Sequence, residues 1–242
     1  MNEKWNPLSV ILLAVGIALA GWFIGSGFVK SRTANRYVTV KGVSEKDVKA
    51  DVAFWAIKFS ATDNNLQVVQ NQIKENYKKI LLFLKQFDIP EKNVELQRLN
   101  VSDLLTDPYR SGPVKSRYII TQTLMVRTQN VDAVVNASQA VGRLVDAGVI
   151  LSNREYDNSG PTYLFSGLND LKPQMIAEAT ANARRSAQQF AKDSGSRIAG
   201  IRRANQGVFV ILPRDRTPGV MQSNQVFKTV RVVSTIEYLL KD

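Results

Sequence analysis

The sequence contains no cysteine and no histidine among its 242 residues. The lack of cysteine excludes disulfides, thiol nucleophiles and thiolate metal sites. The lack of histidine removes the most common general base and the most common metal ligand. Catalysis by Asp, Glu, Lys, Ser or Tyr stays open, but no arrangement of these residues in the sequence indicates a reaction. We therefore expect a protein that is not an enzyme and has no catalytic, metal-binding or cofactor-binding residue.

Acidic residues are scarcer than basic ones, with 21 Asp and Glu against 32 Lys and Arg and a net charge of +11. Such an excess favours anionic lipid or nucleic acid as a partner. The basic residues are spread along the chain in runs no longer than a pair, as at Arg184–Arg185 and Arg202–Arg203. They do not alternate with aromatic residues as single-strand binding proteins require. We expect a solvated basic surface and no nucleic-acid partner.

Acidic pairs and Ser-Lys neighbours give only weak signals for chemistry. Glu45 and Asp47 are expected in a solvated turn. Asp103 and Asp107 could line a cation site, but two carboxylates four residues apart do not define one. No phosphate-binding loop of the form GxxxxGK[ST] occurs. The remaining candidates are two pairs of sequence neighbours without further support, Lys30–Ser31 and Lys115–Ser116.

Residues Leu8–Val29 contain no charged residue. A helix of this length, at about 1.5 Å per residue, reaches the thickness of a bilayer core of about 30 Å. Gly21 and Gly25 form a small-xxx-small pair within it, which can seat a neighbouring helix but is a weak signal. The alternative is a cleaved signal peptide, for which Ala18-Leu19-Ala20 offers a cleavage pattern. Because the apolar run continues to Val29, we favour an uncleaved anchor.

The charges beside this segment bear on its orientation. Glu3 and Lys4 cancel before it, whereas Lys30, Arg32 and Arg36 follow it. Taken alone, this bias would keep the C-terminal side in the cytoplasm. Large C-terminal domains can nevertheless translocate regardless of flanking charge.

Residues 36–242 alternate between strand and helix patterns. Strands are predicted at Arg36–Val43, Asp51–Ala61, Val94–Leu104, Arg117–Thr128, Val149–Asp157, Thr162–Ser166, Arg197–Ala204, Val208–Leu212 and Val226–Leu240. Helices are predicted at Asn65–Phe87 and Asn130–Val145, and a third begins near Asp170. Residues Ser44–Lys49 are expected to form a hairpin turn. The order predicts an α+β fold with a largely antiparallel sheet packed with about three helices, plus the N-terminal transmembrane helix.

The third helix organises this region. Asp170 is expected to cap it, Pro173 to lie in its first turn and Gly195 to end it. Its predicted inner face is mostly alanine, which lets a sheet approach closely, and consists of Ile176, Ala179, Ala183, Ala187 and Phe190. Its predicted wet face consists of Glu178, Asn182, Arg185, Gln189 and Lys192.

Four stretches resemble the SIMPL domain family of mostly bacterial envelope proteins. They are Val38–Val43 with Val40 and Gly42, Asp51 followed by the strand Val52–Phe59, the alanine-rich Ala177–Gly195, and the closing strand Val226–Tyr238. The likeness covers Arg36 to Asp242. It implies an exported α+β domain, and some members form ring-shaped or channel-like homo-oligomers or are linked to oxidative and envelope stress. The family supplies no catalytic residues.

We therefore expect residues 1–7 as a tail, 8–29 as a transmembrane anchor, 30–35 as a linker and 36–242 as a SIMPL-like α+β domain. The expected protein spans the inner membrane once, through contacts of residues 8–29 with lipid, and places its C-terminal domain in the periplasm. It would act as a homo-oligomeric structural or stress-related envelope protein. One or both of the long loops Asp107–Arg117 and Pro213–Gln225 would take part in subunit contacts or line an opening. The alternatives are a monomeric binding module for an anionic envelope ligand and a hydrolase of an envelope polymer.

Overall fold

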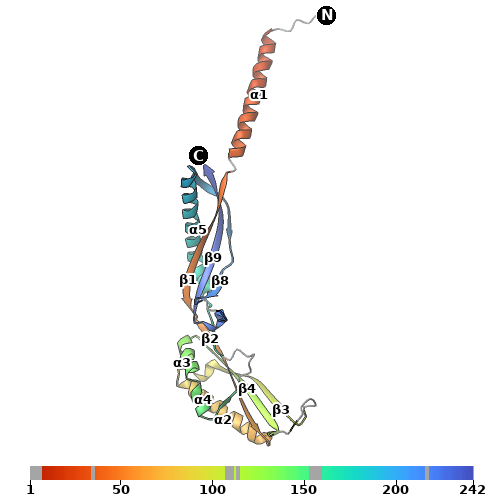
Figure 1. The fold of residues 1–242 in the computed structure, drawn as a ribbon, viewed down its shortest axis with the longest axis vertical. Coiled ribbons are helices and arrows are strands. Elements are labelled where there is room, and N and C mark those ends of the chain that lie inside the picture. Colours follow the sequence, from red (N-terminus) through yellow and green to blue (C-terminus); the bar gives the residue numbers. More distant parts are fainter. Residues whose placement is uncertain are drawn as a thin grey trace. The chain divides into compact units, whose positions relative to one another are not determined.

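The structure is a computed structural model, and it describes residues 7–33, 36–106, 112, 115–152, 160–215 and 218–241 (Figure 1). The predicted fold class is confirmed, since helices pack on antiparallel sheets and one apolar helix lies at the N-terminus. The chain forms two compact units, each with its own sheet. The sheet A unit comprises Met1–Glu45, Lys172–Val210 and Arg231–Asp242, and the sheet B unit comprises Lys46–Leu171 and Ile211–Val230.

Sheet A has the strand order β1-β9-β7, formed by Tyr37–Lys49, Phe227–Lys241 and Arg197–Gln206, and the short β8 (Val210–Pro213) also pairs with β9. The Leu240 amide donates to the Arg36 carbonyl at 2.9 Å, and the Ala50 amide donates to the Val226 carbonyl at 2.8 Å. These two bonds join opposite ends of the strands, so β1 and β9 run antiparallel.

The predicted turn at Ser44–Lys49 is wrong, because β1 continues through these residues. The predicted hairpin is also wrong, since β1 pairs with β9 whereas β2 (Val52–Asp63) belongs to sheet B. The charges that suggested a turn find partners across the ladder. Glu45 lies 3.3 Å from the Arg231 guanidinium, and Asp47 accepts a 2.6 Å hydrogen bond from Thr229.

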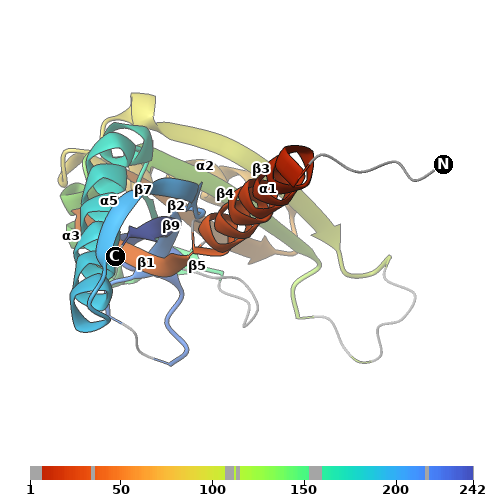
Figure 2. The same cartoon turned by 90° about the horizontal axis from the view of Figure 1, so that it is seen from above.

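One face of sheet A is covered by α5 (Leu168–Asp193), as Figure 2 shows from the end of the helix. The expected alanine contact is confirmed. Its buried row is Met175, Ala179, Ala183, Ala187 and Ala191. The backbones meet at Gly42, where an added Cβ would lie 1.9 Å from the Ala179 carbonyl oxygen.

Three details of the α5 prediction are wrong. Pro173 was expected in the first turn but lies inside the helix, past the turn that begins at Leu168. Phe190 was expected inside but is 60% exposed, because the buried row follows the i, i+4 ridge and Ala191 takes the inner place. The helix begins at Leu168, so Asp170 lies within its first turn instead of capping it. The predicted end is confirmed, since Gly195 follows the last turn with a φ of 68°.

Sheet B has the order β3-β4-β2-β5, and β6 also pairs with β2. Its further strands are β3 (Val94–Asp103), β4 (Tyr118–Thr128), β5 (Ile150–Leu151) and β6 (Thr162–Leu164). The helices of this unit are α2 (Leu66–Lys85), α3 (Val131–Gln139) and α4 (Gly142–Asp146). Short 3-10 helices lie at Glu91–Asn93 and Gln222–Asn224. The helix predicted at 130–145 is divided near Ala140. Of the strand predicted at 149–157, only Ile150–Leu151 is formed, and residues 153–159 lie outside the described part.

The core of the sheet B unit is built from large apolar side chains. Phe59 of β2, Leu124 of β4 and Ile80 and Leu84 of α2 are fully buried. Asn65 caps α2 by accepting the Gln67 amide at 2.9 Å. The cap and the apolar period together confirm the helix predicted at 65–87.

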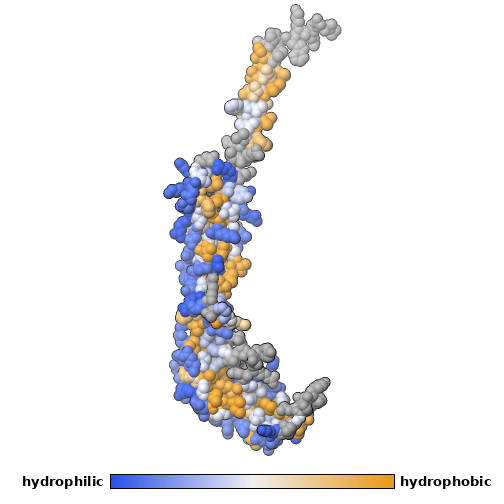
Figure 3. All heavy atoms as spheres, viewed as in Figure 1, coloured by the Kyte–Doolittle hydropathy of each residue, from blue (hydrophilic) through white to orange (hydrophobic). Residues whose placement is uncertain are grey.

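The N-terminal helix α1 (Pro7–Thr33) contains the stretch Ile11–Phe28, which has a mean hydropathy of 2.0 and is not buried against the described part of the chain. Figure 3 shows the hydrophobic colouring that extends along most of this helix. Its length and composition suit a membrane anchor or a signal sequence.

Candidate functional site

The strand β3 lies at the edge of sheet B, where it pairs with β4 (Figure 1). Within the described residues no strand pairs with its other side. The backbone N–H and C=O groups along that side are therefore open to another strand. Such an edge can bind an extended segment by extending the ladder.

The apolar residues of β3 are only half covered. Leu96 pairs with Leu124 and Val101 pairs with Ile120 in the ladder, so each pair shares one face of the sheet. Leu124 and Ile120 are buried beneath α2, whereas Leu96 and Val101 are each 49% exposed and Leu99 is 55% exposed. In each pair the β4 residue is buried and the β3 residue is half exposed. This difference indicates that α2 covers β4 and leaves β3 open.

A groove of about 290 Å³ runs between α2 and β3. Its walls and floor are formed by Leu66, Gln70, Ile73, Lys74, Leu99, Val101, Ile120 and Gln122. Leu66 is 43% exposed at the rim of this groove. The groove is mostly apolar, with Lys74 as its one cation, and suits the side chains of a neighbouring protein segment.

An ion pair closes one end of β3. The Arg117 guanidinium donates three hydrogen bonds of 2.8 to 3.1 Å to both carboxylate oxygens of Asp103. These bonds lower the pKa of Asp103. The Arg117 amide also donates to Asn64 at 2.9 Å. Asp103 thus binds an arginine where the sequence suggested a cation ligand, and Asp107 lies outside the described residues.

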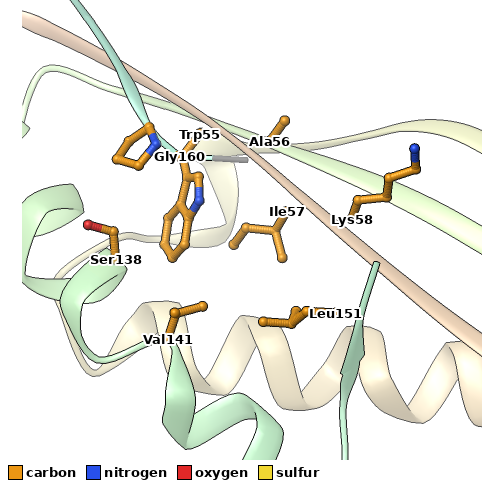
Figure 4. Close-up of a pocket in the computed structure, with 9 residues that line it drawn as sticks. Trp55, Ala56, Ile57, Lys58, Ser138, Val141, Leu151 and Gly160 are labelled. Atoms are coloured by element: carbon orange, nitrogen blue, oxygen red, sulfur yellow. The ribbon is translucent and has the colours of Figure 1, made fainter. Parts of the chain in front are cut away.

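A second, smaller pocket of about 110 Å³ lies between β2 and the end of α3 (Figure 4). The Trp55 and Ile57 side chains point into it towards Val141 and Leu151, while Lys58 extends away. The Ser138 hydroxyl donates to the Val135 carbonyl at 2.8 Å. The space is small beside ligand pockets of about 300 Å³ or more, and we interpret it as a packing void.

The remaining sequence candidates are the two pairs of Lys and Ser neighbours. Lys115 and Ser116 precede β4, and Lys30 and Ser31 lie near the end of α1. Across the part of the chain that the structure describes, no cluster of three or more acidic residues could hold a metal ion. These candidates therefore indicate no reaction or metal site.

The loop Pro213–Gln225, as far as it is described, lies against β9. The Arg214 guanidinium is 4.5 Å from the centre of the Phe227 ring, and the Gln225 side-chain amide donates to the Asp215 carbonyl at 2.7 Å. The Lys228 ammonium donates to the Gln222 carbonyl at 2.5 Å. The expectation that this loop joins subunits stays a prediction.

Lys228 is a feature that sequence reasoning missed. Its side chain is fully buried, and burial lowers its pKa. It lies in a strand where Val230 and Val232 are also fully buried. Lys228, Val230 and Val232 are two residues apart, so their side chains share one face of the strand, and this spacing was a signal that Lys228 points inward. A lysine near a strand end is nevertheless ordinarily taken as exposed.

The comparisons with known proteins agree with this architecture. The model of the SIMPL family, described as a protein of unknown function (DUF541), matches residues 38–235. No curated protein matches the chain. The matched region includes sheet B, α2, α5 and most of sheet A, and it begins after α1. Since the match covers most of the chain, the chain belongs to the SIMPL family.

Proposed function

We propose that this chain is a membrane-anchored, extracytoplasmic protein that assembles with further copies of itself as a structural or stress-related component of the cell envelope. The observation that carries the proposal is the open edge of β3 with half-exposed Leu96, Leu99 and Val101. An uncovered edge of this kind favours association. A partner that extends the sheet would satisfy the backbone groups and cover the apolar side chains in one step. We assign the protein no reaction.

The occupant that we propose is β3 of a second copy. Two antiparallel strands are related by a two-fold axis, so one strand can pair with its own copy. If the axis passes through Asn100, then Leu99 of each copy lies opposite Val101 of the other. Arg98 lies opposite Ser102, so no like charges meet. The strand is thus complementary to itself in this register.

Confinement of the copies by α1 supports such pairing. Tethering to one membrane surface raises the effective concentration of the attached domains, so a modest interface suffices for assembly. The extracytoplasmic side and the envelope role are supported by the family resemblance and by the apolar N-terminal helix. The pairing strand β3 and the anchor helix α1 are separate elements, so anchoring and pairing can be tested with separate variants.

Cysteine cross-linking tests the pairing, because the chain has no cysteine of its own. In an Asn100→Cys variant the two sulfurs would face each other across the axis, with Cα atoms about 4.5–5.5 Å apart, which suits a disulfide. We expect mild oxidation of membranes to give a covalent dimer. The matched control is Ser102→Cys, whose copies would lie about 13 Å apart in this register.

The mass of the detergent-solubilised chain provides the second readout. Leu99→Glu should shift an assembled form towards the monomer, because it places a charge in the covered stripe. Equal cross-linking of the Asn100→Cys and Ser102→Cys variants would indicate random collisions and reject the register. A monomeric mass for the unmodified chain would reject assembly itself.

A further inference from the structure

Three basic residues meet at one end of sheet A. Arg36 precedes β1 and accepts the Leu240 amide through its carbonyl, while Arg197 of β7 lies opposite Lys241 of β9 in the ladder. The Arg36 guanidinium donates to the Ser196 hydroxyl at 3.3 Å, which joins the start of β1 to the start of β7. Figures 1 and 2 both show the end of β9 beside the start of β1. We call this group the basic end.

The side chains of the basic end are exposed. Two carboxylates lie near these residues in sequence: Asp193, which accepts a 2.9 Å hydrogen bond from Gln189, and Asp242, which follows Lys241. Further along the sheet, Glu237 lies 3.8 Å from Arg202. Arg36, Arg197 and Lys241 thus outnumber the two carboxylates that lie nearest to them in sequence.

The chain itself limits the distance between the basic end and α1. The helix ends at Thr33 and β1 begins at Tyr37, with three residues between them. A fully extended chain gains at most about 3.3–3.6 Å per residue, so these two positions are no more than about 14 Å apart. If α1 spans a bilayer, the start of β1 therefore stays close to the lipid headgroups, whatever the orientation of the sheet.

An aromatic side chain lies beside this end. Tyr37 is 47% exposed, and the Arg202 guanidinium lies 4.1 Å from the centre of its ring. Tyrosine is enriched at the level of the headgroups because it has an apolar ring and a polar tip. Arginine and lysine at this depth bind phosphate groups of anionic lipids.

We propose that Arg36, Arg197 and Lys241 bind the phosphate groups of anionic lipids in the bilayer that α1 crosses. The occupant follows from the short connection to α1 and from the charge of the basic end. Such binding would hold the start of β1 at the membrane surface. The proposal does not depend on pairing through β3.

The test uses the full-length chain reconstituted in vesicles of phosphatidylcholine and phosphatidylglycerol in equal parts. After gentle extraction in detergent, mass spectrometry measures the ratio of the two lipids that stay bound. We expect phosphatidylglycerol to be enriched several-fold on the unmodified chain. Combining Arg36→Gln, Arg197→Gln and Lys241→Gln should remove most of this enrichment. The matched control removes the same charge from the exposed lysines of the sheet B unit, with Lys78→Gln, Lys85→Gln and Lys92→Gln.

The outcomes separate this proposal from the others. Loss of enrichment in the first variant alone supports the basic end, provided that both variants keep the circular dichroism spectrum of the unmodified chain. Equal retention of phosphatidylglycerol by the two variants, or no enrichment on the unmodified chain, overturns the proposal. Cross-linking through Asn100→Cys should be unchanged in the first variant, so failure of one proposal does not imply failure of the other.

Discussion

The two units pack a helix on a sheet with side chains of different size. In the sheet A unit, α5 presents Ala179, Ala183 and Ala187, and β1 offers Gly42 beneath them. In the sheet B unit, α2 presents large side chains such as Ile80 and Leu84. All of these helix residues are fully buried, so both interfaces are well packed along their centres.

The difference lies in the layer between helix and sheet. Small residues let the backbones of α5 and β1 touch, and close contact leaves no space for another group between them. Large side chains fill the layer between α2 and the strands β2 and β4, and β3 keeps half-exposed apolar residues beside the helix. The comparison teaches that the layer of large side chains leaves a groove at its margin with room for a partner, whereas the alanine contact fixes the geometry of its own unit.

Gly42→Ala should break the tight interface. Its methyl group would lie 1.9 Å from the Ala179 carbonyl oxygen and 2.5 Å from the Ala183 amide nitrogen, and neither backbone atom can rotate away. We expect the free energy of unfolding to fall by more than about 3 kcal/mol. Urea unfolding of the detergent-solubilised chain measures this change.

The control is Gly200→Ala in β7, where no heavy atom lies within 4 Å of the added Cβ. We expect a change within about 0.5 kcal/mol there. If Gly42→Ala proved as mild as this control, the close approach of α5 to β1 would be incorrect.

Leucine truncation should separate the covered and open parts of the sheet B unit. Leu84→Ala removes a fully buried side chain and should cost about 3 kcal/mol of unfolding free energy. Leu99→Ala removes a side chain that is 55% exposed and should cost less than about 1 kcal/mol. Its larger effect should be on assembly, measured by the mass in detergent. Equal stability losses for the two variants would mean that β3 is covered within one copy.

Much of the fold follows from local patterns. Asn65 marks the start of α2, Gly195 marks the end of α5, and the alanines of α5 mark the centre of its buried face. These signals act within a few residues, so they can be read without knowing the rest of the structure. The strands were also found within a few residues of their ends, with the exception of β1 and the strand expected from 149.

The failures concern partners that are distant in sequence. Glu45 and Asp47 suggested a turn because their partners on β9 are more than 180 residues away. The groove was not predicted because the sequence of β3 does not say that the strand lies at an edge. Strand order is decided by the packing of the whole sheet. The ion pair of Asp103 with Arg117 was missed because it joins two strands across a long loop.

Lys228→Met should give a smaller effect that depends on pH. The lysine lies on β9 close to the tightly packed Val230, and its burial lowers its pKa below the ordinary 10.5. Between the lowered pKa and 10.5, the unfolded chain binds more protons than the folded chain, so stability rises with pH. Below the lowered pKa, the full cost of burying the charge is present.

Methionine fills similar space without the charge, so the variant should equal or exceed the stability of the unmodified chain near neutral pH. The stability of the unmodified chain should rise relative to that of the variant as the pH approaches 10.5, because Lys228 loses its proton and the cost of burying its charge disappears. Urea midpoints at about pH 7 and about pH 10 measure this convergence. A stability difference that stays constant over this range would contradict the burial of the ammonium.

Asp103→Asn should have the smallest effect on stability, and it tests how the open edge strand β3 is held in place. The hydrogen bonds from Arg117 lower the pKa of Asp103 below its ordinary 3.8, so the folded chain holds the carboxylate in its charged form. Its contribution is complete above 3.8 and is lost as the pH falls through the lowered pKa. The urea midpoints of the variant and the unmodified chain should therefore differ slightly at neutral pH and converge in acid, and Arg117→Gln should abolish the difference. Because this ion pair fixes the end of β3, its loss should also reduce cross-linking through Asn100→Cys. Unchanged cross-linking would show that the remaining ladder to β4 suffices to hold the open edge in place.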